Sequence, residues 1–390
     1  MTEEKKAKIL ADLIDFDPVF LEIKELFLSN LVMISEIPAP TFEEQERVGF
    51  LLNKFSEANL INTSTDEYGN ALGILPGTEE GENILIVSNI DTSVDFTADH
   101  SVSVGPGTVT GPAVGNNAVG LAAITILPAL FEKLGITLKS NLILMGSSRS
   151  LGKGSLGGLR FFLKNTRHPI KAGICLEGMN LGEISHRSLG MMRCEIIYNT
   201  PDNFDWRMFG RIGAIETLSE IISRIREIPI PGKPRTSVSF ASIESGTAYS
   251  LVASEGILRF EIRSESEEMV IMLKHEIQNI VAEVSSSYGI EVTMDVVGQR
   301  NPGGIPFTHP LITSVRDIME ALDIKTTVQP TTNELSAFID IGIPAVTIGI
   351  TNGSIKDKNN EEIEIGPVSQ GLKTLLGLIL SVDREEYDES

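Results

Sequence analysis

Hydrophobic and polar residues follow two periods along the chain, one typical of buried strands and the other of helices. Continuous apolar runs, which indicate buried strands, occupy 83–89, 141–146, 171–178 and 343–350. Apolar residues at helical spacing occupy 7–34, 41–58, 116–135, 156–165, 309–323 and 370–382. Because the strands alternate with helices, we expect a mostly parallel sheet that helices cover on both faces.

Two of these helices carry local signals at single residues. Thr41 and Glu44 have the spacing of a capping box, which predicts that the second helix begins there and runs to about Ala58. Pro128 lies inside the helix predicted over 116–135, where its missing N–H predicts a kink.

The pattern changes near residue 190. A strand, a helix, two strands, a helix and a strand follow in order at 191–199, 214–225, 235–246, 249–266, 267–289 and 290–298. This β-α-β-β-α-β order is typical of a split-βαβ, ferredoxin-like α+β domain of about 110 residues. We therefore expect an α/β domain made of residues 1–192 and 303–390, with a smaller domain, 193–302, inserted into it.

Composition and charge restrict the class of protein. The chain has 390 residues, 42% of them hydrophobic and 22% charged, which favours a globular protein of two domains. Its formal net charge of −21 would repel nucleic acid phosphates and anionic lipids, so we expect neither nucleic acid nor membrane as a partner. The same charge is also simply typical of a soluble surface.

The cysteines and the apolar runs bear on the compartment. Cys175 and Cys194 lie in apolar runs, so we expect buried free thiols, as in the reducing cytoplasm. The N-terminal segment alternates in charge and has no signal-peptide core. The longest apolar run, about 121–131, contains Pro128 and is too short to span a bilayer. We expect a cytoplasmic protein.

The glycine-rich segment GSSRSLGKGS (146–155) lies between a predicted strand and a predicted helix, as a phosphate-binding loop would. Such a loop needs four residues between the first Gly and Gly-Lys-Ser/Thr, whereas five separate Gly146 from Gly152 here. Gly154 also stands where the hydroxyl residue belongs. A glycine-rich turn explains the segment better than nucleotide binding.

Eight segments along the chain have counterparts in one known family. The α/β part contributes IPAPTFEEQERVGFLLNKF, NILIVSNIDT, GPAVGNNAVGLAA, LMGSSRSLG, GICLEG and GIPAVTIG. The inserted part contributes GRIGAIETLSEII and a strand that ends in EIRS. In this order the segments resemble the M20 metallopeptidases, dizinc aminopeptidases, carboxypeptidases and deacylases of N-acyl amino acids. The resemblance implies a zinc-peptidase-like α/β domain, an inserted dimerisation domain and a homodimer.

The resemblance also implies where the zinc ligands of the family would stand. The first His position is Asn89, and the position of the bridging Asp is Asn116. Asp91 is retained, but in the family it orients the neighbouring His, which is absent here. A dizinc site needs imidazole and carboxylate ligands, so both asparagines weaken the expected site.

The remaining ligand positions are changed as well. Ser148 and Arg149 stand where the family has a general base and a ligand, and only Glu177 keeps the identity of a ligand. The last His should lie within 355–360, where Asp357 is the nearest counterpart by spacing. Arg149 would then supply the positive charge of the lost zinc by pairing with Glu177 and Asp91.

The family's substrate-binding positions fall in the inserted domain. Phe204 stands at the position of a His that crosses the dimer, and Ser250 stands at the position of an Asn. Arg263 is retained, and an interdomain ion pair explains it as well as binding of a substrate carboxylate. The five histidines lack metal-ligand spacing to one another, and His186, which follows Glu177 closely, has a structural role or faces the cleft.

These substitutions favour a protein of the M20 fold that has lost zinc and catalysis and that binds a ligand or regulates a partner. A peptide or an amino-acid-like small molecule is the ligand that the fold suggests. The alternative is a metal-dependent hydrolase with a rearranged site, in which Asp91, Glu177, Asp357 and the amides of Asn89 and Asn116 hold one hard ion.

Overall fold

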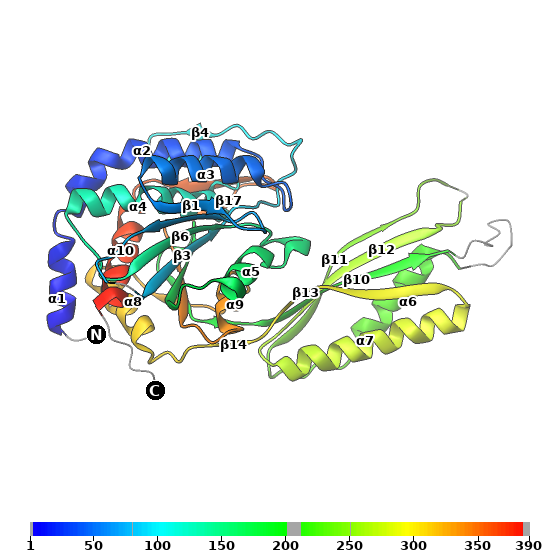
Figure 1. The fold of residues 1–390 in the computed structure, drawn as a ribbon. Helices are drawn as coiled ribbons and strands as arrows, with labels where there is room; N and C mark the ends of the chain where they lie inside the picture. Colours follow the sequence, from blue (N-terminus) through cyan, green and yellow to red (C-terminus); the bar gives the residue numbers. More distant parts are fainter. Residues whose placement is uncertain (1–2, 80, 201–211, 250, 385–390) are drawn as a thin grey trace. The chain divides into compact units, whose positions relative to one another are not determined.

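The computed structural model describes residues 3–79, 81–200, 212–249 and 251–384. The chain divides into two compact units, the large unit Met1–Ser188 with Gly304–Ser390 and the small unit Leu189–Gly303 (Figure 1). The boundaries expected from the sequence, near residues 192 and 302, lie within a few residues of this division.

The large unit is built on an eight-stranded sheet of mainly parallel character. Its strands, in spatial order, are β1 (Ile61–Thr65), β2 (Ala71–Leu75), β6 (Asn141–Ser147), β3 (Asn83–Asn89), β7 (Ile170–Glu177), β16 (Ala345–Gly349), β8 (Glu183–Ser185) and β15 (Thr327–Val328). The central strands β6, β3, β7 and β16 run parallel, and β2 and β8 are antiparallel to their inner neighbours. The four strands predicted from apolar runs are these central four.

Alternate residues of each central strand face opposite sides of the sheet, and both sides are apolar. On β3, Ile84 and Ile86 belong to the core under α2 (Phe16–Glu36), α4 (Val119–Leu134), α8 (Pro310–Ala321) and α10 (Val368–Arg384). Leu85 and Val87 belong to the core under α5 (Gly157–Asn165) and α9 (Leu335–Ile339). A strand buried on both faces is a continuous apolar run, which explains why sequence alone identified it.

The helices differ from the predictions mainly where they begin. The first predicted helix is two helices, α1 (Glu3–Asp12) and α2. The helix predicted from Thr41 begins later, as α3 (Gln45–Glu57), because the Thr41 hydroxyl donates to the Asp91 carboxylate, 2.8 Å away, instead of capping the helix. The capping-box prediction was therefore wrong.

The apolar helix that contains Pro128 is longer than the run of about eleven residues expected from the sequence. A π-helical turn, η1 (Val114–Ala118), leads into α4, and Gly135 ends it with a positive φ of 63°. Among the described residues, the stretch Val114–Leu134 alone is long and apolar enough to cross a membrane, but 89% of its window is buried inside the protein. Its composition is thus that of a core helix.

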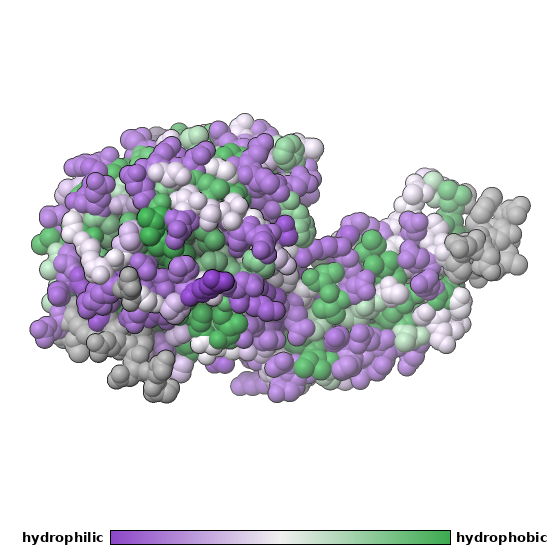
Figure 2. Space-filling view, viewed as in Figure 1, coloured by the Kyte–Doolittle hydropathy of each residue, from purple (hydrophilic) through white to green (hydrophobic). Residues whose placement is uncertain are grey.

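Smaller elements complete the large unit. A four-stranded sheet has the order β17 (Gly353–Ile355), β18 (Asn360–Glu364), β5 (Thr108–Pro112) and β4 (Ser103–Val104). The remaining elements are the 3-10 turn η2 (Gly152–Gly154) and the short strands β9 (Arg187–Ser188) and β14 (Gly303–Gly304). Hydrophilic residues dominate the face of the large unit seen in Figure 2, as the net charge of −21 requires.

The small unit has the β-α-β-β-α-β order expected from its sequence. Its elements are β10 (Gly190–Asn199), α6 (Ala214–Glu227), β11 (Thr236–Ser245), β12 (Glu255–Ser264), α7 (Glu267–Tyr288) and β13 (Glu291–Arg300). The antiparallel sheet has the order β11-β12-β10-β13, and α6 and α7 bury one face of it. The α/β class with an inserted split-βαβ domain is thus confirmed.

Candidate functional site

The positions that the resemblance assigns to the site meet at one edge of the large sheet. Asn89 ends β3, Ser148 and Arg149 directly follow β6, and Glu177 ends β7. These three strands are parallel neighbours, so their carboxyl ends lie side by side. In α/β folds this edge is where ligands bind.

Asp91 is the most completely buried acid at this edge. Its carboxylate accepts hydrogen bonds from the Thr41 hydroxyl and the Leu151 N–H, each at 2.8 Å. Burial raises the pKa of Asp91 to about 6, and the carboxylates of Glu334 and Glu44 raise it further, while the two hydrogen bonds act in the opposite direction. Asp91 therefore lies in a site where negative charge is not fully compensated.

The charged group that faces Asp91 is Arg47 on α3, which the sequence analysis did not single out. Arg47 is fully buried, and its guanidinium donates to the carbonyl oxygens of Ile37 and Ile90, at 3.1 and 2.9 Å. Burial lowers the pKa of Arg47 to about 9, and the charge of Asp91 opposes this shift. The signal available in the sequence was a single arginine on the apolar side of an amphipathic helix.

The two asparagines at expected ligand positions are held in different ways. The Asn89 amide donates to the backbone carbonyl of Asp91 at 2.9 Å and, at 3.4 Å, to its carboxylate. The Asn116 backbone N–H donates to the Glu361 carboxylate at 2.7 Å, as does that of Gly115 at 2.8 Å. Glu361 on β18 thus holds the turn that carries Asn116.

Ser148 and Arg149 both direct their side chains away from the retained acids. The Ser148 hydroxyl donates to the Gly69 carbonyl at 2.7 Å, and Arg149 adopts a positive φ of 55°. The Arg149 guanidinium lies over two aromatic rings, 5.0 Å from the centroid of Tyr68 and 5.8 Å from that of Phe42.

The prediction that Arg149 pairs with Glu177 and Asp91 was therefore wrong. Aromatic faces attract a guanidinium. The side chain of Arg149 lies over the rings of Phe42 and Tyr68 and does not extend toward the buried acids. The Arg149 backbone N–H in turn donates to the Glu44 carboxylate at 2.9 Å, which fixes the turn.

Glu177 lies in a strongly acidic environment. Its carboxylate accepts a hydrogen bond of 2.7 Å from the Asn333 amide. Burial raises the pKa of Glu177 to about 7, the hydrogen bond from Asn333 opposes this, and the charges of Glu334 and Glu183 add to the rise. In this environment a cation or a proton would stabilise the carboxylate.

Glu334 lies in TNELS, the segment that corresponds to the Ser-Thr-Asp-x-Asn stretch of the M20 metallopeptidases. It is 6% exposed, and its Oε1 atom has no hydrogen-bond partner among the described residues. Its charge raises the pKa of Asp91, Glu177 and Cys175, so it lies within electrostatic range of all three groups. The resemblance pointed to this position, and the structure adds its burial and the reach of its charge.

Asp357, the expected counterpart of the last His, lies in an exposed turn between β17 and β18. Its carboxylate accepts hydrogen bonds from the backbone N–H groups of Asn359 and Asn360, both at 2.9 Å. These bonds lower the pKa of Asp357 and leave the side chain committed to its own turn. The structure gives no support to Asp357 as a site residue.

Two positions expected to bind substrate, Phe204 and Ser250, lie outside the described residues. Arg263 pairs with Glu261 on its own strand, β12, and Arg193 of β10 reaches the same carboxylate at 2.7 Å. His186 lies in the large unit with Nδ1 2.8 Å from the Ile305 carbonyl, which is the structural role favoured by the sequence.

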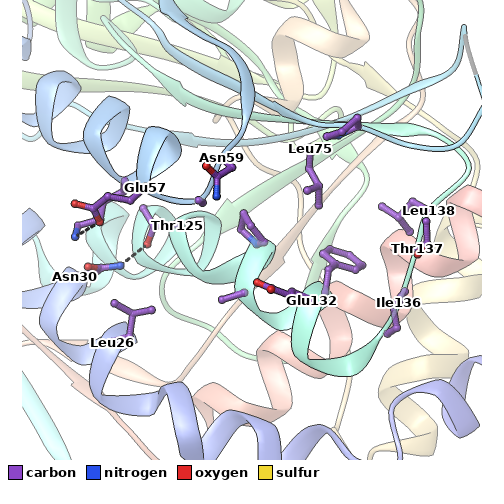
Figure 3. A pocket seen from close by; sticks show the side chains of 16 residues that line it. Leu26, Asn30, Glu57, Asn59, Leu75, Thr125, Glu132, Ile136, Thr137 and Leu138 are labelled. Atoms are coloured by element: carbon purple, nitrogen blue, oxygen red, sulfur yellow. Dashed lines mark hydrogen bonds and ion pairs between the residues drawn. The ribbon is translucent and has the colours of Figure 1, made fainter.

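A hollow of about 550 Å³ lies at the end of the large sheet opposite to the strand ends that carry the acids (Figure 3). Leu75 lines it and pairs with Leu142 at the start of β6, far from the strand ends that carry the acids. Its polar side chains already have partners, since Asn30 donates to Thr125 at 2.9 Å and Lys54 pairs with Glu57 at 2.8 Å. The acidic edge is therefore the better candidate site.

Comparison with known proteins agrees with this architecture. Residues 210–289 match the M20 family model described as a peptidase dimerisation domain. No curated protein matches the chain by sequence.

Solved structures share the whole fold at low identity. The di-peptidase Dug1p from Saccharomyces cerevisiae has a TM-score of 0.77 and 12% identity over 96% of this chain and 99% of its own. Aminopeptidase PepT from Bacillus cereus has a TM-score of 0.67 and 17% identity over 92% and 98%. The YXEP protein of Bacillus subtilis, a dinuclear metal-binding peptidase from the M20 family, has a TM-score of 0.61 and 14% identity over 92% and 97%. Residues 210–289 thus resemble an M20 peptidase dimerisation domain, and the chain as a whole has the fold of these solved peptidases.

Proposed function

We propose that this protein of the M20 peptidase fold does not carry out dizinc hydrolysis and instead binds a ligand or regulates a partner through the acidic edge of its large sheet. The observation that carries the proposal is the pair Ser148 and Arg149. They stand where the family resemblance puts a general base and a metal ligand, and both side chains are committed elsewhere.

Ser148 cannot replace a general base. A hydroxyl has no basic form at neutral pH, and its single proton is donated to the Gly69 carbonyl. Loss of a positioned base costs about 10²–10⁴ in rate. Turnover at the family's rate would therefore require a base from another position.

Arg149 cannot serve as a metal ligand. A guanidinium carries only donors and does not lose its proton in proteins. Its place over Tyr68 and Phe42 keeps the side chain away from Asp91 and Glu177, so this position supplies no ligand there.

The remaining donors also suit two zinc ions poorly. Asn89 and Asn116 offer only neutral amide oxygens, and Asp357 is tied to its own turn. Neutral amide oxygens and a carboxylate that is committed to its own turn are a donor set that favours a site without resident zinc.

The proposal also covers the oligomeric state and the cellular compartment of the protein. A homodimer formed through the small unit is the arrangement that the matched dimerisation domain favours. The two buried cysteines, which are free thiols, support a cytoplasmic protein. A peptide or an amino-acid-like molecule is the ligand class that the peptidases of this fold suggest.

One observation favours a second candidate, a metal-dependent hydrolase of peptides or N-acyl amino acids with a rearranged site. Asp91 and Glu177 both lie within range of the charge of Glu334 and are incompletely neutralised, and Glu334 has a carboxylate oxygen with no described partner. Carboxylates of this kind can hold a hard cation. This candidate needs a base that the positions compared so far do not provide.

A turnover assay decides between the two. The protein is incubated with zinc or manganese and with dipeptides, tripeptides and N-acetyl amino acids, and free amine is measured. We expect no turnover above that of an Asp91→Asn, Glu177→Gln double variant. Turnover that requires added metal and is lost in this variant would establish the second candidate.

A further inference from the structure

A polar cavity of about 230 Å³ opens beside Glu177 in the large unit. Seven of the side chains that line it are polar, and we call this set the Glu177 pocket: Glu177, Asn180, Glu183, Ser185, Thr331, Asn333 and Thr347. The cavity is too small for a folded partner or a long peptide, and it has room for one small organic group.

Strand register brings these residues to one face of the sheet. Thr347 of β16 lies directly opposite Ser185 of β8. Glu183 precedes Ser185 by two residues, so both side chains point to the same face. On the other side of β16, Glu177 of β7 lies opposite Gly349, against which the backbone of Met179 and Asn180 packs closely.

The pocket carries charge of one sign. Glu177 and Glu183 both line it, and no Lys, Arg or His belongs to its described lining. Asn333 satisfies only the Oε1 atom of Glu177, and the Glu183 carboxylate makes no ion pair with a described residue. Two carboxylates in a small cavity without a cation favour a positively charged ligand.

A second observation is independent of the acids. Ser185 is 2% exposed and lines the pocket, and its hydroxyl makes no hydrogen bond with a described residue. The hydroxyl oxygen is available to a ligand that supplies a donor. Thr347 and Thr331, by contrast, already bond to Asn333.

We propose that the Glu177 pocket binds the primary ammonium group of a small amine, such as an amino acid derivative or an aliphatic amine. An ammonium group has three N–H donors, and Glu177, Glu183 and Ser185 offer three acceptors. A bare metal ion would need its ligands within about 2.0–2.6 Å, whereas an ammonium group donates hydrogen bonds of about 2.8 Å and spans more widely spaced oxygens.

This inference rests on the proposed function, since it assumes that no metal ion occupies Glu177. Isothermal titration calorimetry of the full chain with ethylammonium chloride at constant ionic strength tests it. Ethanol controls for binding of the ethyl group of ethylammonium. Tetramethylammonium controls for binding of a positive charge that has no N–H donors. The same protein sample is analysed for zinc and manganese.

We expect saturable binding of ethylammonium, with no comparable binding of ethanol or tetramethylammonium. The variant Glu183→Gln should weaken binding about tenfold or more, and Ser185→Ala about fivefold. The matched control Glu291→Gln, an exposed acid of the small unit, should leave the affinity within about twofold.

Absence of ethylammonium binding in protein free of metal would overturn the inference and leave the proposed function standing. An unchanged affinity in both folded variants would also overturn it, because binding would then occur elsewhere. Zinc or manganese found at stoichiometric amounts would instead contradict the proposed function itself.

Discussion

The guanidinium of Arg149 lies 5.0 Å from the centroid of the Tyr68 ring, and Tyr68 stacks in turn on Phe161 at 4.6 Å. The positive charge that follows β6 is thus held on an aromatic surface and not on Asp91 or Glu177. The buried acids must find compensation elsewhere, and Arg47, hydrogen bonds and protons are what the structure offers them.

The Arg149–Tyr68 contact should be measurable as a coupling. We expect Tyr68→Leu to lower the free energy of unfolding by about 1–2 kcal/mol, because it removes both the cation–π contact and the stack on Phe161. Urea unfolding of Tyr68→Leu, Arg149→Leu and the double variant should give a coupling of about 0.5–1 kcal/mol. Strict additivity would mean that the guanidinium does not rest on this ring.

Arg47 should be essential for the stability of the large unit. Arg47→Leu leaves the carbonyls of Ile37 and Ile90 without their donor and Asp91 without its buried positive neighbour. We expect a loss of about 3–5 kcal/mol, as for other broken buried charge pairs. Chemical denaturation measures it, with Lys54→Met, a partly exposed residue of the same helix that pairs with Glu57, as the control. A loss of unfolding free energy in Arg47→Leu below that of the control would refute this stabilising role of Arg47.

The pH dependence of stability follows from the pKa of Glu177, raised from 4.5 to about 7. A carboxyl with a raised folded-state pKa contributes stability that is complete below its unfolded pKa and is lost as pH rises through the folded value. We therefore expect the wild type to lose stability relative to Glu177→Gln between about pH 5 and pH 8. A glutamine can still accept the hydrogen bond from Asn333.

Urea unfolding of the wild type and Glu177→Gln at several pH values provides the measurement. Asp91→Asn should show the same trend at lower pH, because the pKa of Asp91 is about 6. The exposed control Glu291→Gln should follow the wild type. Parallel curves for wild type and Glu177→Gln would show that the carboxyl titrates normally.

Both cysteines should be inert in the folded protein. Burial raises the pKa of the Cys194 thiol to about 12 and that of Cys175 well above its ordinary value. Since the thiolate is the reactive form, a thiol reagent should label neither residue under native conditions and both after unfolding. Rapid labelling of Cys175 in native protein would mean that the acidic edge opens.

The sequence predicted the central sheet well because its four inner strands are buried on both faces. It missed β1, β4, β5, β17 and β18, which are exposed or half-buried and have no apolar run. The sequence also predicted a helix cap at Thr41 that does not form. The spacing of Thr41 and Glu44 fits a capping box, but the Thr41 hydroxyl donates to the Asp91 carboxylate instead.

The candidate site was predictable only as a location. Strand ends placed Asn89, Ser148 and Glu177 together, but no sequence pattern says where a flexible side chain points. Arg149 shows the limit, since its partners Phe42 and Tyr68 come from other segments of the chain. The resemblance put Glu334 at a family position, but only the fold shows that its charge reaches Asp91 and Glu177.

The absence of a resident dimetal centre is the central claim, and metal analysis tests it most directly. Untagged protein is purified without chelator, dialysed against zinc and manganese, freed of unbound ions and analysed by elemental mass spectrometry. The YXEP protein of Bacillus subtilis, a dinuclear metal-binding peptidase, serves as the control of the same fold. We expect far less than one ion per chain, whereas one or two tightly held ions per chain would contradict the account.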